Sequence, residues 1–565
     1  MSFNWTYGRA LAAAVFIMLV MLTKNVVYQY DYLVGANLPN PDSYYKLVLI
    51  KDYNPEHGFQ FIARDNAPEG SWIHWSIPHT WTIMQLQKGV MLLGVDSDKA
   101  LLLAGGGLTI LSMLLLAIFV AVTVLNIGSN LAAVLSVLAL ATSFPLFGYG
   151  QFVQITHHIF MLVPIAAACI FFFRKDMQTR KMYDFIGGVL LGLAIWISPE
   201  TMPLMLAVAA ARAALQLQQK NPSWLWPAAL GLMMMLMLAW AIDPPPPTFQ
   251  PWALDHISLA WLLFGALIAT LMLIDDMCVY QKLSLKSSLL ILIISLAFCV
   301  CAWLWIVPGA LHGPSGLIPL ELKELWWSKI KELQSVSTPS QSVAYLFVPA
   351  LSGFWLVYIA WKERQLWLLI LALSTLAYSM LGGMFIRMGA ASALISALAF
   401  GVCISRLKIL SSSGDPNKFP LHQQLFGVLV ILLLPAQVFI MVMLEGDNNK
   451  QVFDASCEWD KLYEHLAILP AGVVMLPLNK APELLFKAHH YTISGNYHHN
   501  VDGLLDVVRF FNSPKSEISE NIINKRDVKY IAYCANKNNV TDDVEFFKKF
   551  GFSAKKINGL YFFER

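Results

Sequence analysis

The chain has 565 residues, of which 57% are hydrophobic and only 13% are charged, and its formal net charge is +3. Typical soluble proteins carry about 25% charged residues, so this composition excludes a soluble enzyme with a large core, a disordered protein and a nucleic-acid binder. The 75 charged residues are unevenly distributed, because 30 of them lie in the last 120 positions. The sequence therefore predicts a multi-pass membrane protein with a small water-soluble domain at its C-terminus.

A run of about 20 apolar residues is needed for each helix that crosses a bilayer, since lipid offers no partners to backbone N–H and C=O groups. The sequence contains thirteen such stretches: 10–29, 98–126, 130–149, 155–173, 184–198, 203–219, 223–242, 257–275, 287–307, 343–361, 366–383, 386–405 and 424–444. The first is too long for a removed signal peptide and lacks a clear small-residue cleavage site, so we expect it to remain as an anchor.

The basic residues of the short loops indicate the orientation. If the N-terminus is cytoplasmic, all of these loops fall on the cytoplasmic side, as the positive-inside rule requires. Their basic residues are Arg174, Lys175, Arg180, Lys181, Lys220, Lys282, Lys286, Lys362, Arg364, Arg406, Lys408 and Lys418. We therefore predict a transmembrane domain over 1–445, with long outer loops at 30–97 and 308–342, and a water-soluble domain over 446–565 on the outer side.

The C-terminal domain shows the pattern of a small α/β fold. Short β-branched or aromatic runs predict strands at 472–478, 491–497, 528–534 and 560–564, and helices are expected around 456–468, 502–512 and 518–525. Cys457 and Cys534 are its two cysteines. Because an oxidising compartment permits a disulfide, they are either paired or two free thiols.

Ionisable and aromatic residues concentrate in the predicted outer loops. The first loop contains Asp42, the segment 64–70 and the segment 74–78. His157 and His158 stand at the start of the fourth span, where imidazoles are costly to bury unless they are ligated, hydrogen-bonded or facing water. Carboxylates, imidazoles and aromatic rings therefore gather at one membrane face.

Two further ionisable residues lie at outer ends of spans. Glu200 follows the fifth span, and Arg387 lies near the outer end of the twelfth. A guanidinium facing lipid is expensive, so Arg387 is expected to face a polar site. A reaction on a lipid-linked phosphate would use such a set of groups.

This plan resembles the GT-C superfamily of polyprenyl-phosphate-dependent glycosyltransferases, which includes the oligosaccharyltransferase catalytic subunits and the protein mannosyltransferases. In that superfamily an Asp in the first outer loop, often followed by aromatic residues, is the catalytic carboxylate. Asp42, followed by Tyr44 and Tyr45, fits this pattern. The resemblance implies a GT-C-like membrane fold and transfer of a sugar with inversion.

Other motifs extend the resemblance along the chain. The segments 64–68 and 74–78 look like the "RDNAP…HW[ST]xP" signature of a bacterial GT-C-like group. The segment 156–158 is similar to an Asp-His-His motif whose Asp and last His bind a divalent metal, although Thr156 replaces the Asp. Glu332-Leu333-Gln334 matches a Glu-x-Gln motif of the same group.

The C-terminal domain carries two more segments of this kind. The segment 497–500, followed by Gly503, resembles "YHRN…G", with His499 where Arg is usual. The segment 528–534 resembles "DYVVxC". The likeness therefore spans the whole chain.

Sugar transfer needs a carboxylate for the acceptor, donors for the departing phosphate and a groove for the lipid. The predicted catalytic residues are Asp42 as base, Asp65 and Glu332. The predicted phosphate-binding residues are His74, His158, Arg387 and Arg64. Further candidates near the site are His157, Glu200, Tyr497, His498 and His499.

Structural roles compete with these assignments. Asp42 and Asp65 both suit turn or helix capping, and Arg387 would also be satisfied by an internal carboxylate. His74 stands among tryptophans and would also suit a packing role, and Glu332 would suit a solvated face. The sequence leaves these alternatives open.

The resemblance also implies a metal. Asp42, Glu332 and His158 supply part of a ligand set for Mg²⁺ or Mn²⁺. Because Thr156 carries no carboxylate, a metal-free mechanism is an equal alternative.

We therefore predict transfer of a sugar from a polyprenyl-(di)phosphate donor to a periplasmic glycan, lipid or protein, with membrane lipids and no nucleic acid as partners. The alternative is a lipid or sugar transporter or flippase. A transporter is expected to place charged residues at midplane depth, in paired broken helices, and the sequence shows neither.

Overall fold

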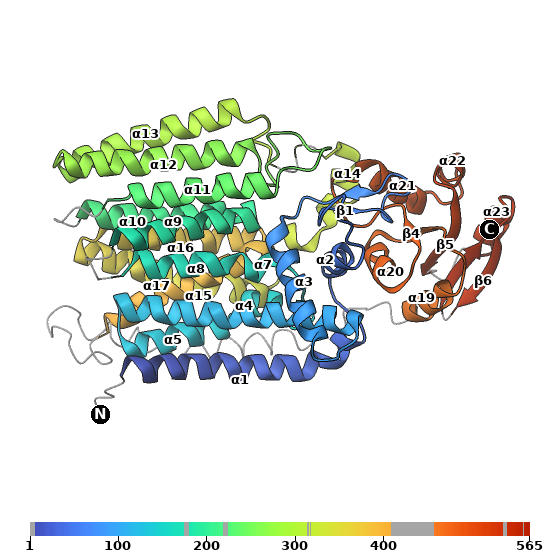
Figure 1. Ribbon diagram of the computed structural model, residues 1–565, viewed down its shortest axis with the longest axis horizontal. Coiled ribbons are helices and arrows are strands. Elements are labelled where there is room, and N and C mark those ends of the chain that lie inside the picture. Colours follow the sequence, from blue (N-terminus) through green and yellow to red (C-terminus); the bar gives the residue numbers. More distant parts are fainter. Residues whose placement is uncertain are drawn as a thin grey trace.

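The computed structural model describes residues 6–174, 180–218, 224–313, 316, 318–407, 457–534, 540–557 and 559–565. It consists of a long helical bundle and a C-terminal domain with a central sheet, and short outer-loop elements lie between them (Figure 1). The bundle helices are α1 (Tyr7–Val34), α4 (Ser97–Ile127), α5 (Asn130–Ala141), α6 (Phe144–Tyr149), α7 (His157–Phe160), α8 (Leu162–Phe172), α9 (Arg180–Ile197), α10 (Met202–Gln218), α11 (Trp226–Ile242), α12 (Leu259–Tyr280), α13 (Leu285–Ile306), α15 (Pro339–Glu363), α16 (Leu366–Met384) and α17 (Gly389–Ser405).

These helices confirm the predicted polytopic helical fold. Twelve of the thirteen predicted spans coincide with helices of the bundle, and the predicted span 424–444 lies outside the described residues. Within the described part of the chain, seven helices are long and apolar enough to cross a membrane, and three shorter apolar helices accompany them.

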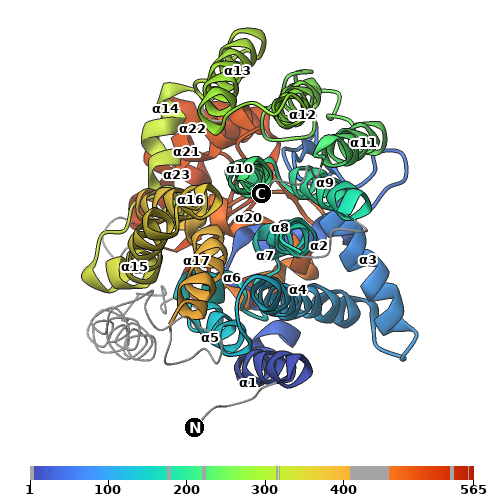
Figure 2. The ribbon, with the colours of Figure 1, turned by 90° about the vertical axis from the view of Figure 1, so that its left-hand side faces the viewer.

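Exposed apolar residues on the outside of the bundle support its place in lipid. On α13, Phe298 is 72% exposed and Trp305 is 88% exposed. Large apolar side chains gathered on one helix in this way would be unfavourable in water. Figure 2 shows α13 at the periphery of the bundle, whereas α8, α10 and α17 lie inside it. The protein is therefore a multi-pass membrane protein.

The core of the bundle is built largely from small and aliphatic residues. On α17, most residues from Gly389 to Ile404 are buried, and many are alanine, serine or glycine. Small residues let helix backbones approach closely where no hydrophobic force drives helices together in lipid. Gly401 shows the consequence, since a Cβ there would meet Ser136 and Val124.

A buried polar group also lies among the bundle helices, whereas the sequence indicated that ionisable residues cluster at the outer ends of the spans. Arg212 on α10 forms a bidentate pair with Asp184 on α9, at 3.0 and 2.9 Å, and both side chains are 1% exposed. Asp276 on α12 accepts hydrogen bonds from the backbone N–H groups of Leu225 and Trp226, at 2.6 and 2.7 Å. These N–H groups begin α11, where a carboxylate satisfies otherwise unpaired donors.

The outer-loop elements lie between the bundle and the C-terminal domain (Figure 1). They are α2 (Pro41–Lys51), β1 (Phe61–Ile62), β2 (Ser71–Trp72), α3 (Ile77–Met91), the 3₁₀ turn η1 (Pro199–Thr201), α14 (Leu320–Leu325), and the 3₁₀ turns η3 (Trp327–Lys329), η4 (Lys331–Leu333) and η5 (Ile386–Met388). β1 and β2 pair antiparallel.

The C-terminal domain has a five-stranded sheet in the order β4-β3-β5-β7-β6. Its elements are α19 (Trp459–Ala467), β3 (Val473–Met475), the 3₁₀ turn η7 (Leu478–Lys480), α20 (Ala481–Lys487), β4 (Tyr491–Thr492), α21 (Val501–Asn512), α22 (Glu517–Lys525), β5 (Val528–Cys534), α23 (Val540–Lys548), β6 (Ser553–Ile557) and β7 (Leu560–Glu564). The first three strands in this order are parallel, whereas β7 and β6 run antiparallel to their neighbours.

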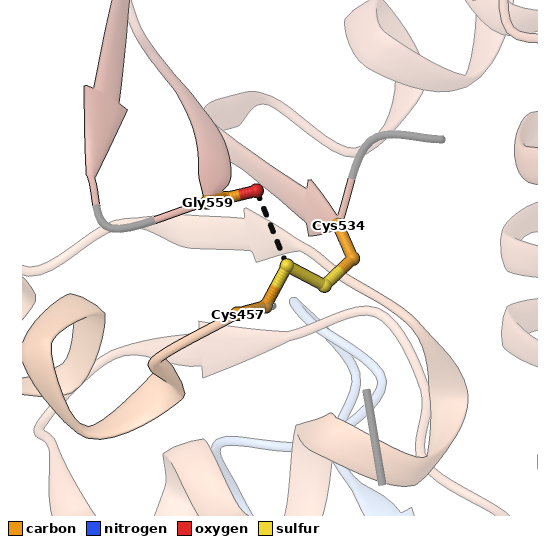
Figure 3. The surroundings of a disulfide bond; sticks show 3 residues. All are labelled: Cys457, Cys534 and Gly559. Carbon is orange, nitrogen blue, oxygen red and sulfur yellow. Dashed lines mark hydrogen bonds between the residues drawn. A yellow bond between two sulfur atoms is a disulfide. The ribbon is translucent and has the colours of Figure 1, made fainter. Parts of the chain in front are cut away.

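The predicted α/β character of this domain is confirmed, but three elements were missed. α20 and α23 were not predicted, and the exposed strand β6 carries the polar run Ser553–Ile557 without the apolar alternation of a half-buried strand. Cys457 and Cys534 form a disulfide that joins the start of the domain to the end of β5 (Figure 3).

Contacts with the first outer loop fix the C-terminal domain against the bundle. Thr492, on the edge strand β4, donates its N–H to the carbonyl of Arg64 at 2.8 Å and accepts from the N–H of Ala67 at 3.0 Å. The loop thereby covers a sheet edge that would otherwise expose unpaired backbone groups. α2 also packs against α20, with Tyr44 beside Phe486.

Candidate functional site

The polar site is built on an irregular segment held at the end of the bundle. Residues 150–156 precede α7 without regular structure. Asn25 on α1 satisfies two of their backbone groups, since its amide donates to the carbonyl of Gly150 at 3.2 Å and accepts from the N–H of Phe152 at 3.0 Å. Ser43 on α2 accepts from the N–H of Ile155 at 3.0 Å. Side chains from α1 and α2 thus provide the hydrogen-bond partners that water would otherwise supply to these buried backbone groups.

Asp42 lies in the first turn of α2. The helix begins after Asn40, whose side chain accepts the N–H of Asp42 at 2.8 Å. Asn40 is therefore the N-cap of α2. The capping role that the sequence suggested for Asp42 is performed by Asn40.

Six ionisable residues from five elements of the chain form a polar group at the start of α2. We call this group the Asp42 cluster; its members are Asp42, His157, His158, Glu200, Glu332 and Arg387. Arg387 on η5 pairs with Glu200 on η1 at 2.5 Å. Glu332 on η4 lies 3.9 Å from Nε2 of His158 and accepts from Asn40 at 3.4 Å. Arg387 thus pairs with an internal carboxylate, which was the alternative to a site role, but that carboxylate belongs to Glu200, a member of the Asp42 cluster.

Asp42 interacts electrostatically with other charged residues of this group. Burial raises the pKa of Asp42 to about 6, while the charges of Arg387 and Lys46 lower it and that of Glu200 raises it. Burial and the Asp42 charge raise the pKa of Glu332 to about 7, against the lowering effect of Arg387. Carboxylates with raised pKa values next to a cation are frequent in active sites.

The Asp42 cluster contains a donor set that fits a divalent cation. His157, His158 and Glu200 each offer a ligand atom, and these atoms lie within 4.8 Å of one another. Neither ring nitrogen of the buried His158 has a hydrogen-bond partner among the described residues. Glu332, 3.9 Å from Nε2 of His158, adds a carboxylate of the kind that hard cations prefer. Glu200 thus brings to the histidine pair the carboxylate that Thr156 does not supply.

A second group lies beside the first and joins three segments of the chain. We call it the His74 cluster; it consists of His74, Asp255, His498 and His499. Asp255 Oδ2 lies 2.8 Å from Nε2 of His498 and 2.6 Å from Nε2 of His499. The rings of His74 and His498 are 4.9 Å apart. Tyr497 joins this group, because its hydroxyl accepts the N–H of His74 and contacts Nδ1 of the same residue.

Arg64 and Asp65 are engaged with partners that belong to neither cluster. Arg64 donates to Asp52 at 2.9 Å and to the carbonyls of Leu485, Ala488 and His490 at 2.6, 2.7 and 3.3 Å. A guanidinium occupied in this way joins the loop to the C-terminal domain, and its donors are not left for a phosphate.

Asp65 has a similar linking position. Its carboxylate is fully buried and accepts from Tyr45 on α2 at 2.9 Å and from Thr492 on β4 at 2.8 Å. Both oxygens are therefore occupied by hydroxyl donors. Asp65 thereby joins α2 to the edge strand β4 of the C-terminal domain.

Sequence reasoning missed two residues of the site. Lys46 is 1% exposed and its ammonium lies 4.1 Å from the centroid of the Trp75 ring. Its spacing of four from Asp42 places both on one face of α2, which was a usable signal. Asp255 stands in a proline-rich loop, and its sequence surroundings give no comparable sign of its partners.

Comparison of the sequence with protein-family models and with curated proteins finds no match. The fold is similar to that of the oligosaccharyltransferase AglB of the archaeon Archaeoglobus fulgidus. The apo crystal structure superposes with a TM-score of 0.69 at 16% identity, over 94% of this chain and 70% of the other. The structure of AglB in complex with an inhibitory peptide and a dolichol-phosphate superposes with a TM-score of 0.65 at 15% identity, over 93% of this chain and 69% of the other.

A third structure of the same enzyme, a complex with zinc and sulfate, gives a TM-score of 0.60 at 15% identity, over 91% of this chain and 67% of the other. Oligosaccharyltransferase catalytic subunits belong to the GT-C superfamily that the sequence motifs resemble. The similarity therefore confirms the predicted GT-C-like fold, in both the bundle and the C-terminal domain.

Proposed function

We propose that this protein is a membrane glycosyltransferase that uses a polyprenyl-phosphate-linked sugar as donor. The observation that carries the proposal is the Asp42 cluster, in which carboxylates, imidazoles and a guanidinium meet at the end of the bundle that faces the C-terminal domain. The similar AglB structure with a dolichol-phosphate supports a lipid-linked donor. A lipid tail in the bilayer would bring its phosphate to this end.

Asp42 is the base in this mechanism. Its carboxylate takes the proton of the acceptor's hydroxyl or amide group, and the acceptor atom forms a bond to the anomeric carbon of the sugar. The bond from that carbon to the phosphate oxygen breaks, and the lipid phosphate leaves with the electron pair. A single displacement of this kind inverts the anomeric centre.

Arg387 and His158 bind the phosphate in our proposal. A guanidinium offers parallel N–H donors that suit phosphate oxygens, and Nε of Arg387 has no hydrogen-bond partner among the described residues. Preorganised donors stabilise the charge that grows on the leaving group. Glu200 holds the guanidinium through its 2.5 Å contact.

A divalent cation, Mg²⁺ or Mn²⁺, would be held by His157, His158 and Glu200, together with Glu332 beside His158. Such an ion supplies Lewis-acid stabilisation of a departing phosphate. The donor set supports this assignment, because it joins two carboxylates to two imidazoles, and neither ring nitrogen of His158 has a hydrogen-bond partner among the described residues.

The direct test uses the purified protein and a panel of labelled polyprenyl-phosphate sugars, with hydrolysis and transfer as readouts. Asp42→Asn keeps the side-chain size and is expected to lower the rate about 10²–10⁴-fold, the range for loss of a general base. Asp98→Asn is the matched control, since Asp98 is an exposed partner of Lys51. An unchanged rate in Asp42→Asn would refute the assignment of the base.

The transporter alternative makes a different prediction in the same assay. A flippase would move the lipid-linked sugar across reconstituted vesicles without breaking its phosphate bond. Release of free lipid phosphate therefore supports the transferase, and translocation of intact donor alone contradicts it. We further propose a bacterial inner-membrane location with the C-terminal domain in the periplasm.

A further inference from the structure

The His74 cluster carries an inference that is independent of sugar transfer. It combines three imidazoles and one carboxylate from the first outer loop, from the α11–α12 loop and from the C-terminal domain. One ligand atom from each of His74, Asp255, His498 and His499 lies within 4.8 Å of the other three. We propose that this cluster is a zinc site that fastens the C-terminal domain to the outer loops.

The donor chemistry selects the ion. Zn²⁺ is bound by imidazole nitrogen and carboxylate oxygen, almost always with four ligands when the site is structural. Mg²⁺ prefers oxygen ligands and an octahedral shell, which three imidazoles do not provide. The His74 cluster therefore suits zinc, whereas the carboxylate-rich Asp42 cluster suits a harder cation.

The present distances are close to those of a metal site. Zinc–ligand bonds of about 2.0–2.1 Å place tetrahedral ligand atoms roughly 3.3 Å apart. Asp255 Oδ2 now lies 2.8 and 2.6 Å from the two Nε2 atoms. Small outward shifts of these three side chains, with a closer approach of His74, would produce the required spacing.

Neighbouring groups hold the ligands in place. Tyr497 contacts Nδ1 of His74 at 2.8 Å, so a proton on Nδ1 would leave the Nε2 lone pair for the metal. Phe249 stacks on the ring of His499 with centroids 3.9 Å apart. Such outer contacts orient the ligands of a metal before it binds.

The backbone around the ligands is also fixed. Asn500 caps α21 by accepting the N–H of Gly503 at 3.1 Å, and its amide donates to the carbonyl of Ile493 at 3.2 Å. His256 contacts the carbonyl of His74 through Nδ1 at 2.7 Å. Side chains of the cluster are mostly shielded, with 11–17% exposure for Asp255, His498 and His499.

The experiment measures metal on the full-length protein in detergent. The protein is stripped with a chelator, incubated with ZnCl₂, passed through a desalting column and analysed for zinc by mass spectrometry. We expect one retained equivalent in the wild type, and its loss in the double variant His498→Gln, His499→Gln. His489→Gln is the matched control, because His489 is an exposed histidine of the same domain.

The variant His158→Gln separates the two clusters. Zinc retained in His158→Gln and lost in the double variant supports the proposal. Zinc lost in His158→Gln and retained in the double variant overturns it, as does wild-type protein that retains no zinc. In that last case the cluster is held by hydrogen bonds alone.

A measurement on the wild type avoids dependence on any variant's folding. Cobalt substituted for zinc gives an intense visible spectrum when four-coordinate and a weak one when six-coordinate. We expect the intense spectrum, and its disappearance on addition of zinc. A weak spectrum would contradict a closed four-ligand site. Because none of these readouts is transfer activity, the proposal stands or falls separately from the glycosyltransferase function.

Discussion

Lys46 is a buried cation one helical turn from Asp42 on α2. Burial lowers its pKa to about 7, although the charges of Asp42 and Asp243 raise it. The pKa of Asp42 is raised to about 6. The two groups therefore change charge within a narrow range near neutral pH, and each influences the other.

This coupling predicts the pH dependence of transfer. Since the base must be ionised, the rate should rise as the pH passes through about 6, where Asp42 loses its proton. Lys46→Met removes a positive charge that lowers the pKa of Asp42, so the rise should move to higher pH. Initial rates from about pH 5 to 8 measure this shift.

Lys88→Met serves as the control, because Lys88 is exposed on α3. It should leave the pH profile where it is in the wild type. A rise that stays in place or moves to lower pH in Lys46→Met would contradict the electrostatic link between Lys46 and the base.

At the scale of elements, α9 and α10 are joined by a buried ion pair between Asp184 and Arg212. A buried charge left without its partner is costly, and breaking such a pair typically lowers stability by about 3–5 kcal/mol. Arg212→Met should therefore reduce the unfolding temperature strongly. The double variant Asp184→Leu, Arg212→Met should recover most of the loss, because apolar replacements remove both charges.

Thermal unfolding of the protein in detergent, followed by a thiol-reactive or tryptophan signal, measures these effects. A single variant as stable as the wild type would show that the pair contributes little. A double variant less stable than Arg212→Met would show that the site requires charge.

The contact between the first outer loop and the C-terminal domain depends on Arg64. Arg64→Ala removes hydrogen bonds to Asp52 and to three carbonyls of that domain. Hydrogen bonds that involve a charged group are worth about 1.5–3 kcal/mol each, so we expect a loss on the order of 2–4 kcal/mol after relaxation. Limited proteolysis should release the C-terminal domain faster than in the wild type.

Arg509→Ala is the comparison for Arg64→Ala. Arg509 pairs with Glu321, but both side chains are about 40% exposed, and exposed pairs contribute only about 0–1 kcal/mol. Equal proteolysis rates for the two variants would indicate that Arg64 does not hold the domains together.

The whole molecule has a polar end and an apolar body. α1 begins at the end of the bundle far from the C-terminal domain (Figure 1), an arrangement compatible with the orientation that we propose from the positive-inside pattern. Fusion of alkaline phosphatase to the C-terminus should therefore give an active reporter in bacterial cells, because this enzyme folds only in the periplasm. A fluorescent protein fused there should stay dark, and the reverse pattern would overturn the proposed orientation.

The disulfide agrees with this placement. Cys457 and Cys534 are bonded, and Cys457 Sγ lies 3.1 Å from the carbonyl oxygen of Gly559 in the β6–β7 turn (Figure 3). The five other cysteines are free, and four of them are buried. Disulfides persist in oxidising compartments, so the bond supports the proposed location of this domain on the outer side of the membrane.

The sequence by itself determined the twelve spans that lie in the described part of the chain. Lipid requires every spanning helix to be long and apolar, and this constraint is local, so it can be read from composition alone. The motif around Asp42 and the pairing candidates Cys457 and Cys534 were equally readable. Strand β6 was missed because an exposed edge strand needs no apolar alternation.

Only the tertiary structure decided which polar residues meet. Arg64 and His74 are ten positions apart in one loop. Arg64 nevertheless donates hydrogen bonds to the C-terminal domain, whereas His74 lies in one cluster with Asp255. Glu200 and Arg387 were both candidates, but their contact joins positions 187 residues apart. Such contacts depend on how helices pack and loops close, and no local pattern records them. Composition therefore determined which segments cross the lipid, and packing determined which polar residues come into contact at the end of the bundle.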